Sequence, residues 1–180
     1  MERDLSNISV IQTSRELGES NNAKSVIPCI LDGVDVIIKT HNQDFEYGPR
    51  FYNNEKNAYL TLQNEDFVPK LLYFDDKNLK LCITDAGEDL SKLKNINLEE
   101  CKEKIINIIE IMKSKYNLFH NDLMPKNICI DKNNELKLID FDRSTVGPHP
   151  PVAGFYDDDH YANITFLENL KHGCGFVTIN

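Results

Sequence analysis

Short apolar runs separated by turn signals fill the first half of the chain. The clearest pair, residues 26–31 and 34–38, flanks Asp32-Gly33, a dipeptide that favours a two-residue hairpin turn. Residues 50–63 then carry apolar side chains at helical spacing. Further strands are expected at residues 8–11, 71–74 and 79–84. This half predicts an antiparallel sheet with one helix inserted after its third strand.

The second half changes to a helical period. Asn97-Leu98-Glu99-Glu100 has the form of a capping box, and apolar residues recur behind it at helical spacing as far as Tyr116. Two short strands, 128–130 and 136–139, are expected around a polar turn. A last helix is expected from Asp159 to about Lys171. The whole chain therefore predicts an α+β fold.

Composition narrows the class of protein. With 41% hydrophobic and 27% charged residues the chain is typical of a folded globular protein. Its net charge of −9 disfavours non-specific binding to nucleic acid or to anionic membranes. Five scattered cysteines without a C-x-x-C pair indicate reduced thiols rather than a zinc site or a disulfide framework. Because the N-terminus also lacks a signal-peptide pattern, we expect a cytoplasmic protein with no nucleic-acid or membrane partner.

The clearest chemical pattern lies between His120 and Asp142. Asp122 stands in a loop after the long predicted helix, Asn127 follows five residues later, and Asp140 comes at the end of the next strand pair. Carboxylate and amide oxygens are hard ligands that suit Mg²⁺. A separate aspartate can orient and deprotonate an attacking hydroxyl. The pattern predicts a phosphoryl-transfer site.

This segment resembles the catalytic loop H-R-D-x-x-x-x-N and the metal motif D-F-G of protein kinases. It departs from them at Asn121, where kinases usually have arginine, and at Asp142, where they usually have glycine. The matching residues are His120, Asp122, Asn127, Asp140 and Phe141. The resemblance implies that Asp122 is the catalytic base and that Asn127 and Asp140 hold magnesium. Lys126 would meet the transferring phosphoryl group.

The first half supports the same resemblance. Val36-Ile37-Ile38-Lys39 stands on the third predicted strand, like the V-A-I-K of kinases, and Glu55 lies in the following helix. Residues 17–24 resemble a degenerate phosphate-covering loop, and residues 81–87 resemble the strand and hinge that bind adenine. The residues implied at the nucleotide are Gly18, Ser20, Ala23, Lys39, Glu55, Ile83, Asp85 and Asp89.

The implied architecture is a bilobal protein-kinase-like fold. Residues 1–86 would form the N-lobe, with its antiparallel sheet and one helix, and residues 87–180 a minimal C-lobe. Residues 87–95 are the expected connection between the lobes. Because few residues follow Asp142 and none of them spells A-P-E, we expect a reduced helical C-lobe. Reduced kinases of this kind include atypical small kinases, bacterial effector kinases and large-virus kinases, so a host cytoplasm is one expected location.

The implied function is an ATP- and Mg²⁺-dependent phosphotransferase, foremost a minimal serine/threonine protein kinase whose protein substrate supplies its own docking surface. Two alternatives stay open. A small-molecule kinase of the aminoglycoside or choline type is disfavoured because no large acceptor-binding lobe follows the catalytic segment. A pseudokinase binding module is disfavoured by the retained Lys39, Asp122, Asn127 and Asp140, and favoured by the degenerate glycine loop. The oligomeric state stays open as well.

Overall fold

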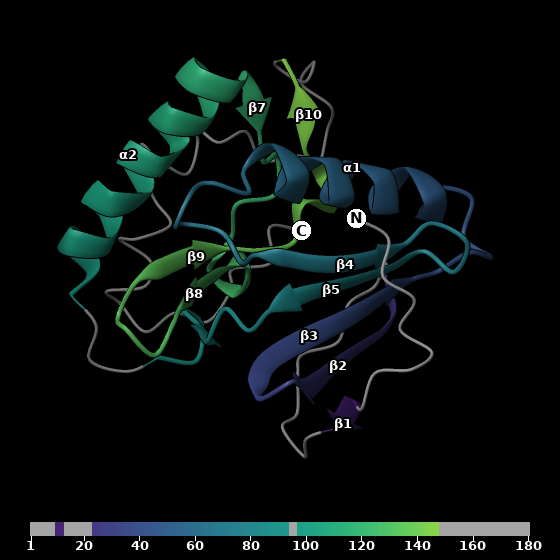
Figure 1. Cartoon of the computed structure of the whole chain (residues 1–180). Coiled ribbons are helices and arrows are strands. Elements are labelled where there is room, and N and C mark those ends of the chain that lie inside the picture. The colour runs from purple at the N-terminus through teal and green to yellow at the C-terminus, as the bar shows by residue number, and fades with distance from the viewer. Residues whose placement is uncertain (1–9, 13–22, 94–96, 148–180) are drawn as a thin grey trace, which may run out of the picture.

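Five antiparallel strands form the main sheet of this computed structural model, which describes residues 10–12, 23–93 and 97–147 (Figure 1). The strand order is β1-β2-β3-β5-β4. Its members are β1 (Val10–Gln12), β2 (Ala23–Leu31), β3 (Val34–His41), β4 (Leu71–Asp75) and β5 (Lys80–Thr84). The predicted antiparallel sheet is thus confirmed, with β2 beginning three residues earlier than the apolar pattern indicated.

The hairpin between β2 and β3 turns where the sequence predicts it. Asp32 and Gly33 both have positive φ, 50° and 81°, and Leu31 pairs with Val34 across the turn. Two consecutive residues with positive φ give the turn a twist that matches that of the flanking strands. The register then continues through Val26 and Lys39 to the pairing of Ser25 with Thr40, and it shifts between Ser25 and Ala23.

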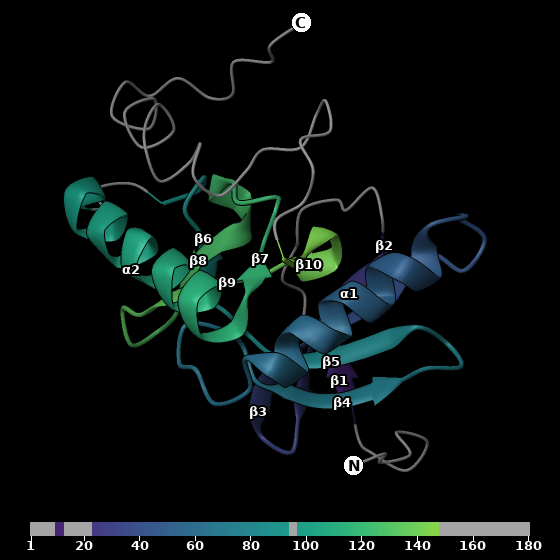
Figure 2. The ribbon, with the colours of Figure 1, turned by 90° about the horizontal axis from the view of Figure 1, so that it is seen from above.

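Helix α1 (Gly48–Thr61) lies across one face of the sheet, as Figure 2 shows from above. It begins earlier than the apolar spacing indicated, because Pro49 in the first turn has a φ angle suited to a helix start and needs no hydrogen-bond partner for its nitrogen. Its buried face carries Tyr52, Glu55 and Tyr59 at helical spacing. One charged residue therefore points inward with the apolar ones.

The remaining described residues form a helix, short 3₁₀ turns and two small sheets. Helix α2 (Leu98–Tyr116) begins at Asn97, whose side chain accepts from the backbone N–H of Glu100 at 3.4 Å. The Glu100 carboxylate contacts Lys104 at 3.1 Å, so the reciprocal half of the predicted capping box is replaced by an ion pair along the helix. The strands are β6 (Glu88–Asp89), β8 (Ile128–Ile130) and β9 (Leu136–Leu138) in one sheet, with β7 (Leu118–Phe119) and β10 (Thr145–Val146) in the other.

Residues 87–95 were predicted as a connection, and the structure adds the short strand β6 within them. Gly87 has a φ of 91°, and a Cβ at this position would lie 2.0 Å from the carbonyl oxygen of Ile130. Glycine therefore lets the chain run against β8. Two-residue strands such as β6, β7 and β10 carry no periodicity, which is why the sequence pattern does not indicate them.

One hydrophobic core joins the sheet, both helices and the β8–β9 hairpin. It includes Tyr59, Leu81, Met112, Leu138 and Phe141. The backbone N–H of Leu138 also donates to the carbonyl of Phe67 at 2.8 Å. The fold is α+β, as predicted, while the proposed boundary between residues 86 and 87 stays a prediction. Gly18, Ser20 and the expected last helix lie outside the described residues.

Among the helices that the structure describes, none combines the length and the apolar character needed to cross a membrane.

Candidate active site

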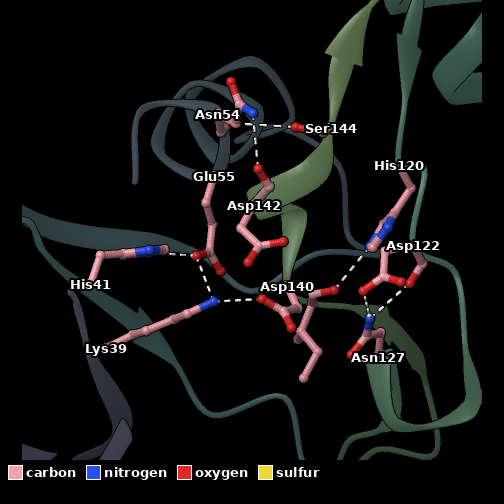
Figure 3. A network of polar contacts seen from close by, with 11 residues as sticks. Lys39, His41, Asn54, Glu55, His120, Asp122, Asn127, Asp140, Asp142 and Ser144 are labelled. Carbon is pink, nitrogen blue, oxygen red and sulfur yellow. Dashed lines mark hydrogen bonds and ion pairs between the residues drawn. The ribbon is translucent and has the colours of Figure 1, made fainter. Parts of the chain in front are cut away.

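Lys39 is the centre of a buried ion-pair network between β3, α1 and the segment after β9 (Figure 3). Its Nζ lies 2.7 Å from Glu55 Oε2 and 2.5 Å from Asp140 Oδ1. Lys39 and Glu55 are 6% and 1% exposed, whereas 22% of the Asp140 side chain is exposed. The predicted pairing of Lys39 with Glu55 is present, and Asp140 joins it from the other half of the chain.

The charges of this network stabilise one another against burial. Burial alone would lower the pKa of Lys39, but the carboxylates of Asp140, Glu55 and Asp142 raise it above its usual value. Burial is the largest single influence on the pKa of Glu55 and of Asp140 and would raise both values. Lys39 opposes burial at both carboxylates, and together with smaller contributions from other neighbours, such as His41 at Glu55, it lowers both values. All three groups are therefore charged at neutral pH.

His41 was not predicted as part of the site. Its side chain is fully buried, and its Nε2 lies 2.8 Å from the Glu55 oxygen that Lys39 also contacts. The signal in the sequence is its position two residues after Lys39, because alternate residues of a strand share one face.

Asp140 itself has a left-handed backbone conformation, with φ 65° and ψ 55°. His120, which is fully buried, donates from Nε2 to the carbonyl of Ile139 at 2.9 Å. The ring of Phe141 packs 4.5 Å from the His120 ring and 5.4 Å from the Tyr59 ring. These contacts fix the turn that presents the Asp140 carboxylate to Lys39.

Asp122 and Asn127 are brought together by a local hydrogen-bonded turn. Asn127 Nδ2 donates to the backbone oxygen of Asp122 at 2.7 Å and to its carboxylate Oδ2 at 3.2 Å. Pro125–Asn127 forms a 3₁₀ turn that holds Asn127 beneath the loop. The amide nitrogen of Asn127 is thus engaged with the protein, and its side-chain oxygen is the atom suited to a hard cation.

The Asp122 carboxyl has a raised pKa. Burial is the main cause, and the nearby Arg143 side chain, followed by that of His120, acts in the opposite direction. Arg143 was not predicted as part of the site. The sequence offers only its place three residues after Asp140 as a signal.

The structure shows what contacts the two residues that depart from the kinase motifs. Asn121 has a φ of 60°, a left-handed conformation that asparagine tolerates better than most residues. Its Nδ2 donates to the carbonyl of Arg143 at 3.1 Å and to Thr145 Oγ1 at 2.9 Å. Asp142, in place of glycine, is buried, and its backbone oxygen accepts from Asn54 Nδ2 at 2.9 Å.

The remaining predicted site residues are spread along the edges of this network. Ala23 begins β2, and Ile83 in β5 is buried opposite Ile37 of β3. The Asp85 carboxylate accepts from the backbone N–H of Gly87 at 2.9 Å.

Asp89 and Lys126 have different surroundings. The Asp89 carboxylate accepts from the Ser91 hydroxyl and lies 2.8 Å from Lys92 Nζ, so it is engaged by its own turn. Lys126 is exposed. Its charge makes a minor contribution that opposes the effect of burial on the pKa of Asp122 and of Asp140. The predicted roles of these residues toward a nucleotide stay predictions.

Asp140 and Asn127 form the donor set that fits magnesium. One carboxylate and one amide oxygen come from segments that the backbone couples, since Ile139 N–H donates to the Asn127 carbonyl at 3.0 Å. No three His, Cys, Asp or Glu side chains among the described residues gather as a metal cage. Mg²⁺ bound by one or two protein ligands takes the rest of its shell from water and phosphate oxygens, so two donors are sufficient.

Comparison with known proteins places the chain in a kinase family. The model of the Haspin-like kinase domain matches residues 48–164, most of the chain. The chain belongs to this family and thus to the protein-kinase-like superfamily, as the motifs predicted. Kinases of this superfamily use ATP as the phosphate donor.

Individual relatives are distant. The chain is 30% identical over 101 residues to the mouse citron Rho-interacting kinase, and 23% identical over 155 residues to the nodulation receptor kinase of Pisum sativum. These matches cover 51% and 72% of this chain but only 5% and 17% of the two relatives. The chain thus spans a small part of the proteins it resembles.

Proposed function

We propose that this protein is an ATP- and Mg²⁺-dependent phosphotransferase that acts on serine or threonine hydroxyls of proteins. The observation that carries the proposal is the contact of Lys39 with both Glu55 and Asp140, at 2.7 and 2.5 Å. This contact joins the predicted phosphate-binding lysine to the predicted metal-binding aspartate, beside a loop that holds Asp122 and Asn127 together.

Each group of residues has a separate role in the proposed phosphoryl transfer. Lys39, held by Glu55, contacts phosphate oxygens of the nucleotide. Asn127 and Asp140 would hold Mg²⁺, which would supply positive charge against the same oxygens. Lys126, exposed beside the loop, meets the phosphoryl group that moves.

Asp122 accepts the proton of the attacking hydroxyl as its oxygen bonds to the γ-phosphorus. The bond from that phosphorus to the β–γ bridging oxygen breaks, and ADP leaves. The raised pKa of Asp122 brings its basicity closer to the working pH than that of an exposed aspartate.

A protein substrate is favoured because positioning carries much of phosphoryl-transfer catalysis. The described part of the chain after Asp140 consists of a 3₁₀ turn and a two-residue strand, and it adds no helical layer around the site. A partner that brings its own docking surface would orient its hydroxyl toward Asp122. The chain's net charge of −9 disfavours nucleic acid as that partner.

The test is transfer of label from γ-labelled ATP with Mg²⁺, using a panel of proteins, aminoglycosides and choline as acceptors. We expect label on serine or threonine of a protein acceptor with the wild type, and none with Asp122→Asn or in EDTA. Label on small acceptors alone would instead establish a small-molecule kinase. Nucleotide binding without any transfer would establish a binding module.

A further inference from the structure

His41 shares its hydrogen-bond acceptor with the central lysine of the site. Glu55 Oε2 lies 2.7 Å from Lys39 Nζ and 2.8 Å from His41 Nε2. Both basic residues stand on the same face of β3, two positions apart. One carboxylate oxygen therefore receives two donors, and rotation of the carboxylate breaks both contacts.

The geometry identifies the form of the His41 ring. A carboxylate only accepts hydrogen bonds, so His41 Nε2 must carry a proton. His41 Nδ1 is buried and makes no hydrogen bond to any described residue. A proton on Nδ1 would be a buried donor without an acceptor, which is costly. The ring therefore contacts Glu55 through a proton on Nε2.

The ring is itself held in place from two sides. The His41 backbone N–H donates to the carbonyl of Leu79 at 2.9 Å, which fixes the end of β3. The Tyr52 ring, one turn before Glu55 in α1, packs edge-on 5.8 Å from the His41 ring. Tyr52 in turn donates from its hydroxyl to Asp76 Oδ1 at 2.7 Å. The donor at His41 is thus preorganised by β3, α1 and the β4–β5 turn.

We propose that His41 is a positioning residue of the active site: it orients the Glu55 carboxylate so that Lys39 is held for the nucleotide phosphates. This inference rests on the proposed function. In the structure Lys39 also contacts Asp140, and a metal at Asp140 would compete for that carboxylate. Glu55 is then the remaining partner of Lys39. Because His41 donates to the same Glu55 oxygen that Lys39 contacts, it fixes that oxygen in the position of the ion pair.

The experiment compares His41→Phe with His41→Gln. Phenylalanine keeps an aromatic ring against Tyr52 but has no donor, whereas the glutamine amide can place an N–H near the original Nε2. We expect His41→Phe to lower kcat/KM for ATP about tenfold, the scale of one hydrogen bond to a charged group. His41→Gln should recover most of that loss.

Two controls separate positioning from a merely structural role. Cys29→Ala trims a buried residue of the cluster with Val36 and Cys82, on the opposite face of the sheet. It should lower the melting temperature without changing kcat/KM for ATP. In a Glu55→Ala background, His41→Phe should have no further effect on nucleotide affinity. An equal loss in both backgrounds, or no recovery by glutamine, would overturn the inference.

Failure of the proposed function can be told apart from failure of this inference. If the wild type transfers no phosphate, the dissociation constant of Mg²⁺-bound ATP is measured instead for His41→Phe, for Glu55→Ala and for the two changes combined. If it binds no nucleotide either, the proposed function has failed, and the ¹⁵N spectrum of labelled histidine decides the inference. An Nε2–H tautomer that is lost in Glu55→Ala supports the contact with Glu55, and an Nδ1–H tautomer in the wild type contradicts it.

Discussion

Lys39 and Asp122 have opposite electrostatic surroundings, although both are proposed to act in the same phosphoryl transfer, Lys39 on the nucleotide phosphates and Asp122 on the attacking hydroxyl. Lys39 lies among carboxylates that come from helix α1 and from the segment after β9, residues distant in sequence. Asp122 lies in a turn closed by Asn127, five residues away, and burial raises its pKa. The first group is stabilised in its charged form, and the second is destabilised in its charged form.

The contrast shows that the two proposed functional groups are held by different interactions. The lysine network connects separate elements by charge, so its strength depends on how the sheet, α1 and the metal-binding segment sit together. The catalytic loop is connected within itself by backbone and amide hydrogen bonds. Removing a charge from the network should therefore affect the whole fold, while changing Asp122 should affect the chemistry alone.

The largest expected effect is on catalysis by Asp122→Asn. Because it removes the proposed base but none of the metal ligands, transfer should fall by about 10²- to 10⁴-fold. The dissociation constant for Mg²⁺-bound ATP should stay within about twofold. Steady-state kinetics and equilibrium binding measure the two quantities. A variant with wild-type turnover would remove Asp122 from the mechanism.

Lys39→Met should destabilise the protein. It leaves Glu55 and Asp140 without their cation, and breaking a buried ion pair costs about 3 kcal/mol of unfolding free energy. Chemical denaturation at neutral pH measures this loss. Asp122→Asn, measured in parallel, should lose little stability, since it removes a charge that burial disfavours.

The pH dependence of stability should differ between Lys39→Met and the wild type. In the wild type the pKa values of Glu55 and Asp140 are lowered, so their contribution is present above the ordinary carboxyl pKa of about 4 and is lost as pH falls through the folded values. In the variant, burial without the lysine raises both values, so stability should increase as pH falls from 7 toward 5. Parallel stability profiles over this range would contradict the account.

A smaller effect is expected from Arg143→Met. Arg143 opposes the effect of burial on Asp122, so its removal should raise the Asp122 pKa further. The acid limb of the kcat profile should move to higher pH by about half a unit, a modest charge–charge effect. The exposed Lys132, in the turn between β8 and β9, supplies a charge-matched control as Lys132→Met. A shift toward lower pH would contradict the assignment.

The smallest expected effect concerns Asn121. Asn121→Ala removes donors to the Arg143 carbonyl and to Thr145, which should cost about 1 kcal/mol of unfolding free energy. These bonds fix the start of the segment after Asp142 without a phosphate, so phosphatase treatment of the wild type should leave its initial rate unchanged. A tenfold loss after phosphatase would show that phosphorylation orders this segment.

The sequence predicted those parts of the fold and of the site that depend on local sequence pattern. The hairpin at Asp32-Gly33, the buried face of α1 and the loop from Asp122 to Asn127 are fixed by turn residues, periodicity and short spacing. The Lys39–Glu55 pair was predicted because it resembles the corresponding pair of kinases.

The sequence could not predict contacts between distant segments. Asn54 donates to the backbone oxygen of Asp142 only once α1 and the metal-binding segment have packed together. The effect of Arg143 on the pKa of Asp122 likewise depends on how the folded chain brings the two side chains together. His41 looks like an ordinary strand end until Glu55 is placed opposite it. The short strands β7 and β10 likewise pair residues 118–119 with 145–146, which are distant in the sequence, and Asn121 donates to Thr145 beside them.

The claim that Asp140 holds a metal together with the nucleotide is tested most directly by calorimetric titration with ATP. The wild type and Asp140→Ala are each titrated with Mg²⁺ and with EDTA. We expect the wild type to bind ATP with Mg²⁺ and to bind it much more weakly in EDTA. The affinity of Asp140→Ala for ATP should not depend on the metal. Stabilisation against heat should follow the same order, because a ligand that binds the native state raises its stability. Absence of binding by the wild type at millimolar nucleotide and metal would contradict the claim, as would equal, metal-dependent affinity in Asp140→Ala.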